Sequence, residues 1–252
     1  MTYFGPFPTV PYQFGNAEEV VAFTDLTAYV EIVDRLKDNL AFYEEYFILE
    51  GDRADQISSK LYGTPNYYWV LYLMNDLIRE KGWPLSERQL KKKAAREFPN
   101  TTLTTTNSLT GVMKESTPIL GLGSSAVGTI IHRRLDFGQL IVSTNDTFQK
   151  GEVISSTSGV VGTETVQIRA QSEEYNAVSH YEDATGRHRD VNPYDASIFG
   201  DPETGGYNGS FAPVTFIEQM RKENEDLKKI KVPKPDVVFE IANTFTDEML
   251  NV

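Results

Sequence analysis

Residues 46–78 constrain the fold most, because capping signals alternate with apolar runs in YFILEGDRADQISSKLYGTPNYYWVLYLMNDLI. YFIL predicts a short strand that ends at the EGD turn, and Asp52 is then a candidate N-cap for a helix. Gly63 has the position of a glycine just past the end of that helix. Thr64 followed by Pro65 is typical of the start of a second helix. This segment therefore predicts a strand and two short helices.

The second predicted helix, at residues 67–74, is apolar almost all round, so we expect it to be buried on most sides. Trp69 lies in this run and is predicted to be a core residue. Trp83 follows a glycine and precedes a proline. We expect it to plug the same module, while stacking against a sugar ring is its other interpretation. Ser86 is expected to cap a further, basic helix that runs through Glu97.

The flanking segments differ in composition. Residues 1–16 are rich in aromatic residues, proline and glycine, which excludes a helix or a central strand and predicts an extended arm. Residues 24–45 change from alternating to helical apolar spacing, so we expect a strand that leads into a helix. Residues 99–129 are dominated by Thr, Ser and Gly and predict a linker or an exposed loop. Residues 130–170 alternate in short runs between turn signals, which favours a small β-barrel or a sandwich.

The C-terminal part is expected to contain a β-hairpin and two helices. The hairpin is HYEDATGRHRDV, with its turn near residues 184–186, and a loop follows it. One helix is predicted at 215–229, and an amphipathic helix follows IKVPKP. The predicted fold class is α+β, with an extended N-terminal arm and lead-in at 1–45, a small α/β module at 46–98, a linker at 99–129, a β-rich insertion at 130–190, and a loop with a helical C-terminal tail at 191–252.

Composition excludes several classes of function. The chain has 252 residues and a formal net charge of −12, which disfavours binding to nucleic acid or to an anionic membrane. It has no cysteine, so disulfides, zinc–cysteine sites and thiol nucleophiles are excluded. The longest apolar run, residues 67–74, is too short to span a bilayer, and the first residues lack the pattern of a signal peptide. We therefore expect a soluble protein that is made and used without Sec export.

The sequence offers little catalytic or metal-binding chemistry. His180, Asp183 and His188 lie close together, and on a hairpin they could face one metal ion. Solvated positions near a turn account for the same residues, and no fourth ligand is evident, so we predict no metal site. GLGSSAVG lacks the lysine and the spacing of a phosphate-binding loop, and no G-x-S-x-G motif follows a strand. Carboxylates that would converge across a cleft are not evident. We expect neither enzymatic activity nor a cofactor.

The segment at 46–78 resembles a LysM module, whose pattern is a strand, a Gly-Asp turn, a helix ending near Tyr-Gly, a second helix and an Asn. With the Trp-Pro that follows, the positions that carry this signature are Gly51, Asp52, Leu61, Tyr62, Gly63, Pro65, Trp69, Asn75, Trp83 and Pro84. A LysM module then returns in a second strand beside its glycan groove. Here GWPLSERQLKKKAAREF follows and is expected to be helical, which argues against peptidoglycan as a ligand.

A longer stretch, from EIVDRLKDNLAFYEEYFILEGDRADQ to GWPLSERQL, resembles the baseplate wedge protein of contractile-tailed (myovirus) bacteriophages, a family that embeds a LysM-like fold. HYEDATGRHRDVNPYD and RKENEDLKKIKVPKPDVVFEIANTFTDEM are similar to later segments of that family. The likeness is close over residues 1–98 and looser over 175–252. It implies a structural subunit of the virion tail baseplate, assembled in the host cytoplasm. Such a subunit clamps adjacent wedges around the hub and touches the sheath-initiator and wedge-core proteins, with no catalysis or cofactor.

Two groups of residues are candidate partner-binding residues. Aromatic side chains on an extended arm and basic side chains on an acidic protein both suit contacts with other proteins. The arm's own core, or solvated helix faces for the basic residues, are the alternatives. The candidates are Tyr3, Phe4, Phe7, Tyr12, Phe14, Lys91, Lys92, Lys93, Arg221, Lys228, Lys229 and Lys231. The alternative function is a LysM-type peptidoglycan-binding module of a phage tail or cell-wall protein, and a glycan-cleaving enzyme is a second rival.

Overall fold

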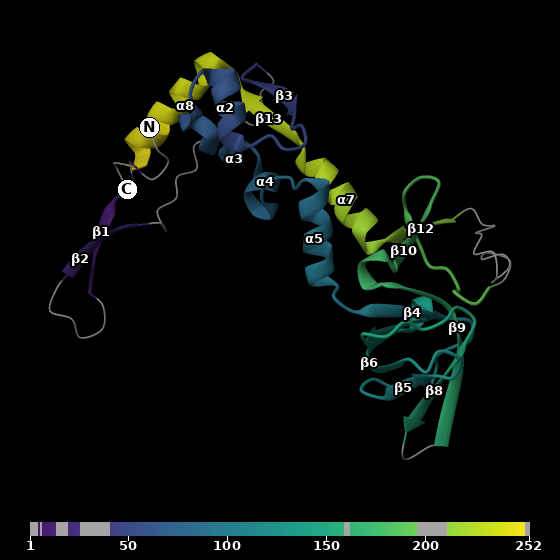
Figure 1. Cartoon of the computed structure of the whole chain (residues 1–252). Coiled ribbons are helices and arrows are strands. Elements are labelled where there is room, and N and C mark those ends of the chain that lie inside the picture. Colours follow the sequence, from purple (N-terminus) through teal and green to yellow (C-terminus); the bar gives the residue numbers. More distant parts are fainter. Residues whose placement is uncertain are drawn as a thin grey trace. The chain divides into compact units, whose positions relative to one another are not determined.

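The computed structural model describes residues 5, 7–13, 20–25, 41–158, 162–195 and 211–249 (Figure 1). Helices and strands both contribute substantially, so the predicted α+β class is confirmed. The chain divides into two compact units. The first contains Met1–Ser86 and Glu223–Val252, and the second contains Glu87–Lys222. No helix in the described part of the chain is both long enough and apolar enough to cross a lipid bilayer.

The N-terminal segment contains an antiparallel hairpin of β1 (Thr9–Gln13) and β2 (Val20–Thr24). Pro11 lies opposite Ala22. A two-stranded sheet has only edge strands, which is where proline is tolerated, so the expectation of no central strand agrees with this hairpin. Most of the strand-to-helix transition predicted at 24–45 lies outside the described residues, as do Tyr3, Phe4 and Phe14.

The rest of the first unit combines a two-stranded sheet with helices. Strand β3 pairs antiparallel with β13, and Tyr46 lies opposite Ile230. The strand predicted over YFIL therefore begins earlier, at Tyr43. The N-cap of α2 is Arg53 and not the predicted Asp52, and its backbone N–H donates to Gln56 Oε1 at 3.1 Å. The elements are β3 (Tyr43–Phe47), α2 (Ala54–Tyr62), η1 (Pro65–Tyr67), α3 (Tyr68–Met74), α4 (Asp76–Lys81), β13 (Lys229–Pro233) and α8 (Pro235–Met249).

The predicted stop and restart between the two helices is confirmed. Gly63 ends α2 in the left-handed region with φ 72°, and its N–H donates to Ser59 O at 3.0 Å. This φ favours glycine because it has no Cβ. Thr64 then accepts a hydrogen bond from the Asn66 backbone N–H on its side chain, and Pro65 begins the short η1 helix that leads into α3.

Two apolar clusters form the core of the first unit. In one, α3 and α8 pack together, and Trp69 lies 4.9 Å from Phe245 between ring centroids. Trp69 is only 3% exposed, which confirms the prediction that it is a core residue. Phe7 is also buried and lies 6.1 Å from Phe245, so this aromatic of the arm contacts the protein's own core. In the other cluster, Ile57 of α2 packs with residues of α3, β3 and β13.

The second unit contains a closed barrel with the strand order β4-β7-β6-β5-β8-β9. The prediction for this region left a barrel and a sandwich open, and the barrel is what forms. Its interior is filled by aliphatic side chains such as Leu103, Ile130 and Ile154, each with no exposed surface. The strands are β4 (Thr101–Thr105), β5 (Pro118–Gly121), β6 (Val127–Arg134), β7 (Gln139–Ser143), β8 (Val153–Ser158) and β9 (Gly162–Glu173).

The predicted linker at 99–129 is wrong, because β4, β5 and the start of β6 lie within it. The β-rich part consequently begins near Thr101 and not at 130. Strand β4 reads TTLTT, and Thr102, Leu103 and Thr105 in it are buried. Threonine is β-branched and fits a pleated strand, so a Thr-rich run was compatible with a strand from the start.

The second unit also contains a three-stranded sheet, helix α5 and the first part of helix α7, up to Lys222. Strand β10 lies between β11 and β12, and the hairpin turn predicted near 184–186 is confirmed, with Gly186 at φ 78°. Ala94 of α5 and Ile217 of α7 share a small apolar cluster. The predicted helices ending at Glu97 and starting near 215 are also confirmed. The elements are α5 (Glu87–Glu97), η2 (Leu135–Phe137), η3 (Glu174–Asn176), β10 (Val178–Asp183), β11 (His188–Arg189), β12 (Phe211–Thr215) and α7 (Phe216–Leu227).

Candidate functional site

The β1–β2 hairpin carries an apolar face that is open to solvent. Its register places Val10 opposite Phe23 and Tyr12 opposite Val21, so all four side chains lie on one face. They are 41%, 43%, 54% and 43% exposed in that order. The Tyr12 and Phe23 rings meet edge to face with centroids 6.2 Å apart. The residues between them on each strand, Pro11 and Ala22, point to the opposite face.

Contiguous exposed apolar residues mark surfaces that bind other molecules. Of the five arm aromatics predicted to bind partners, Tyr12 therefore lies on an exposed face and Phe7 lies in the core. Phe23, which was not predicted, completes this face, and the register of the hairpin is the information that was missing.

The predicted basic residues differ in their surroundings. Lys91 and Lys92 are exposed on α5, and Lys93 lies 3.8 Å from Glu97. Arg221 forms an ion pair with Glu87. Exposed ion pairs of this kind contribute little stability but reduce the charge that a partner would meet.

The second predicted basic stretch continues from α7 into β13. Lys228 pairs with Glu225, Lys229 is exposed, and Lys231 Nζ lies 4.8 Å from the centre of the Tyr43 ring. Among the predicted cations, Lys93, Arg221 and Lys228 thus each lie beside a carboxylate.

The signature residues of the small module mostly hold its strands and helices together. The side-chain amide of Asn75 donates to Leu71 O at 2.8 Å and Lys231 O at 2.7 Å, and its oxygen accepts from Lys231 N at 2.7 Å. Tyr62 Oη donates to Pro233 O at 2.9 Å, and burial raises the pKa of this phenol. Both contacts bind the helices to strand β13.

The other signature residues form or cover turns. Gly51 has φ 90° and lies in the turn before α2, and the Trp83 indole donates to Asp52 O at 2.8 Å. The Trp83 ring lies 5.6 Å from Tyr72, which agrees with the prediction that Trp83 plugs the module. Leu61, Trp83 and Pro84 are partly buried.

In the barrel, Glu152 organises the segment GLGSSAVG. Its carboxylate accepts hydrogen bonds from the backbone N–H of Gly123 at 3.0 Å, Ser124 at 2.8 Å and Gln149 at 2.5 Å, and from Ser124 Oγ at 2.9 Å. Burial by itself raises the pKa of Glu152, but the hydrogen bonds from Ser124, Gln149 and Gly123 outweigh burial and lower it. This part of the predicted linker or exposed loop is thus held by a buried carboxylate.

We expect Glu152→Gln to lower the free energy of unfolding by about 1–3 kcal/mol at pH 7. The donors around Glu152 bond to two carboxylate oxygens, whereas a glutamine amide offers them only one acceptor oxygen. A carboxylate whose pKa is lowered by folding contributes stability above its ordinary value of 4.5, and loses it as pH falls through the lowered value. The difference between the two proteins should therefore shrink in acid. Urea titrations at pH 7 and pH 3.5 measure it, and a constant difference would contradict this role.

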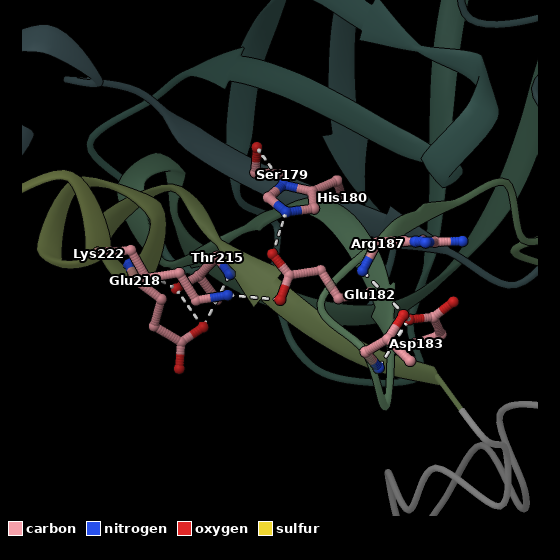
Figure 2. Close-up of polar contacts among 9 residues, drawn as sticks. Ser179, His180, Glu182, Asp183, Arg187, Thr215, Glu218 and Lys222 are labelled. Atoms are coloured by element: carbon pink, nitrogen blue, oxygen red, sulfur yellow. Dashed lines mark hydrogen bonds and ion pairs between the residues drawn. The ribbon is translucent and has the colours of Figure 1, made fainter. Parts of the chain in front are cut away.

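Polar side chains of β10, β12 and α7 lie close together beside the β10–β11 hairpin (Figure 2). His180 Nε2 lies 3.0 Å from Glu182 Oε1, and Lys222 Nζ lies 2.5 Å from Glu182 Oε2. The hydrogen bonds from Lys222 and then His180 lower the pKa of the Glu182 carboxyl. Glu218 accepts from Thr215 N and Oγ1, both at 2.8 Å, at the start of α7.

The grouping of Asp183 with His180 and His188 is wrong. Asp183 accepts hydrogen bonds from Thr185 N at 2.8 Å and Arg187 N at 3.1 Å, and forms an ion pair with Arg189 at 2.9 Å. It therefore belongs to the turn. Alternate residues of a strand point to opposite faces, so the carboxylate that shares a face with His180 is Glu182.

A scan of protein-family models found no match to this chain, and a search of curated proteins found none either.

Proposed function

We propose that the protein is a structural subunit of a contractile-tail baseplate wedge, which binds neighbouring wedge proteins and holds adjacent wedges together around the hub. Sheath-initiator and wedge-core proteins are its expected partners, and the virion baseplate, assembled in the host cytoplasm, is its expected location. The exposed apolar face of the β1–β2 hairpin is the observation that carries this proposal. Burying such a face is favourable by about 25 cal/mol for each Å² removed from water.

The arrangement of the small module supports the same proposal. Strand β3, helices α2 and α3, and strand β13 follow the strand–helix–helix–strand order of a LysM module, with residues 75–228 inserted before the second strand. In this proposal the second strand of the module is β13 (Lys229–Pro233), which pairs with β3. An element built from distant parts of the chain, and joined by Asn75 and Tyr62, is suited to act as a rigid support for partner contacts.

The alternative is a LysM-type module that binds peptidoglycan. The same strand order favours it, but Trp83 donates to the carbonyl of Asp52 in the turn that follows β3. A side chain that occupies this turn leaves its backbone less available to a saccharide. We therefore favour protein partners over glycan.

Two adjacent substitutions on β2 test the proposal. Val21→Glu places a charge on the apolar face of the hairpin, whereas Ala22→Glu places the same charge on the opposite face. We expect Val21→Glu to weaken association with the purified wedge proteins at least about tenfold, because a buried unpaired charge is costly. Ala22→Glu is the matched control and should retain association.

Analytical ultracentrifugation of the wild type and both variants, each mixed with wedge proteins of the same phage, measures this association. Pull-down on insoluble peptidoglycan is run in parallel. Equal association of both variants would contradict a role of the apolar face. Retention on peptidoglycan, without association with wedge proteins, would favour the LysM-type alternative.

A further inference from the structure

We propose that His180, Glu182 and His188 form a binding site for a borderline divalent transition-metal ion, with Zn²⁺ as the ion tested first. Of the residues that the structure describes, these form a group whose nitrogen and oxygen ligand atoms all lie within 4.8 Å of one another. Imidazole nitrogen and carboxylate oxygen are ligands that Zn²⁺ accepts. Two histidines and one carboxylate leave at least one position of a tetrahedral ion open.

The backbone places these side chains together. Glu182 lies directly opposite His188 in the β10–β11 pair, and His180 precedes Glu182 by two residues on the same strand. Residues opposite each other, and residues two apart on one strand, share a face of the sheet. The His180 and His188 rings lie 3.8 Å apart between centroids, so the diagonal pair is in contact. The strand pairing therefore brings both histidines and the carboxylate to one spot.

His180 has a polar neighbour at each ring nitrogen. Ser179 Oγ donates to Gln219 Oε1 at 2.9 Å and lies 3.4 Å from His180 Nδ1. On the other side of the ring, Nε2 lies 3.0 Å from Glu182 Oε1. A ring nitrogen and a carboxylate oxygen share a hydrogen at this distance, and in the proposed site they share the metal ion instead.

The distances fit a metal ion. Two ligands bound to Zn²⁺ at its usual bond lengths lie roughly 3 to 3.5 Å apart, and the His180 Nε2 to Glu182 Oε1 distance is 3.0 Å. The third ligand comes from His188, whose side chain is exposed on a short strand and is free of core packing. A nitrogen of its ring already lies within 4.8 Å of the His180 and Glu182 ligand atoms.

The surrounding residues support this ligand set in the way that outer-shell residues do. Ser179 orients the His180 ring through Nδ1, and Lys222 holds the second oxygen of Glu182, so Oε1 faces the histidine (Figure 2). Ligating histidines generally donate their other ring N–H to an oxygen, and ligating carboxylates are themselves hydrogen-bonded. Gln219 and Lys222 both belong to α7, which keeps these supports on one rigid helix.

The third histidine of the chain supplies a matched control. His132 lies on β6 of the barrel, is exposed, and pairs with Glu115 at 2.7 Å, but it is not part of the group formed around Glu182. A histidine–carboxylate pair is thus present in the same unit without a second imidazole. Comparison of His188→Ala with His132→Ala separates a site built by the hairpin from general binding to histidine.

Isothermal titration of the full-length protein with ZnCl₂, after dialysis against EDTA and then metal-free buffer, tests the proposal. We expect one ion per chain in the wild type. His188→Ala should weaken Zn²⁺ affinity by more than roughly tenfold, the loss that even an outer-shell residue can cause, and His132→Ala should change it less than about twofold. Circular dichroism confirms that each variant is folded, which the exposure of both histidines favours.

Co²⁺ gives a second readout, because bound histidine nitrogen changes its visible absorption spectrum. The spectrum should change with the wild type and with His132→Ala, and should not change with His188→Ala. Affinity that is equal in the wild type and His188→Ala would overturn the proposal, and so would an equal loss in both variants. Absence of Zn²⁺ binding to the wild type at equimolar concentration would also overturn the proposal.

Discussion

Arg134→Met is expected to lower the stability of the second unit by about 3 kcal/mol. The Arg134 guanidinium donates to Gln139 Oε1 at 2.9 Å, Val178 O at 2.6 Å and Ser179 O at 2.8 Å. Its carbon Cζ lies 4.3 Å from the Phe137 ring centre and 4.9 Å from that of Phe216. Burial lowers the pKa of this guanidinium, although arginine remains charged at neutral pH.

This one side chain connects the barrel strand β6 to the sheet strand β10 within the second unit. Methionine keeps much of the aliphatic packing but removes the three hydrogen bonds that the guanidinium donates, although Val178 O still accepts from Gln139 Nε2 at 3.3 Å. Lysine cannot restore the fork of the guanidinium. Amide hydrogen exchange, read by mass spectrometry on peptides from β7 and β10, measures the loss. Arg187→Met, at an exposed position of the hairpin turn, is the control and should change stability by less than about 0.5 kcal/mol. An equal effect of both substitutions would refute this role.

Asn75→Ala is expected to lower the free energy of unfolding of the first unit by about 2–3 kcal/mol. The Asn75 amide acts like a peptide group against Lys231, donating to its carbonyl and accepting from its N–H, and also donates to Leu71 O. Alanine removes these hydrogen bonds, so the backbone N–H and C=O of Lys231 lose their partner and depend on water for hydrogen bonds. Asn75→Asp should lower the free energy of unfolding by at least as much. Aspartate keeps the oxygen that accepts from the Lys231 N–H, but it replaces the donor NH₂ group with a second acceptor oxygen that faces two carbonyl oxygens.

Both tryptophans of the chain, Trp69 and Trp83, lie in the first unit, so tryptophan fluorescence during urea unfolding reports on this unit. Asn66→Ala is the matched control, because Asn66 is exposed beside α3. We expect the control to unfold at nearly the wild-type urea concentration. If Asn75→Asp unfolded at the same urea concentration as the wild type, the contribution of Asn75 to stability would come from its side-chain volume and not from the hydrogen bonds of its amide.

Local signals predicted the part of the fold that depends on neighbouring residues. Gly63 ends α2 and Thr64-Pro65 begins the next helix, because capping depends on groups only a few residues apart. The hairpin turn at Gly186 follows for the same reason. Asp52 shows the limit of such signals, since a neighbouring residue, Arg53, takes the N-cap position through its hydrogen bond with Gln56.

Candidate site residues were predictable only in part. Aromatic and proline content marked the N-terminal arm, yet Phe7 packs against Phe245 and Tyr12 is exposed. Composition does not distinguish these outcomes, because the same aromatic side chain is favoured in a core and at an interface. Similarly, the sequence groups His180 with His188, but whether Glu182 or Asp183 joins them depends on which face of the strand each residue occupies.

Read alone, the amino-acid order specified the helix boundaries around Gly63, the hairpin turn, the α+β class and the exclusion of cysteine chemistry. The tertiary structure decided the pairing of β3 with β13 and the closure of the barrel through the Thr-rich β4. Asn75 and Lys231, whose hydrogen bonds join the end of α3 to strand β13, are 156 residues apart in the chain. Capping is settled by atoms within a few residues, whereas strand pairing depends on which distant edges and apolar faces bury each other, and that choice exists only when the whole chain is folded.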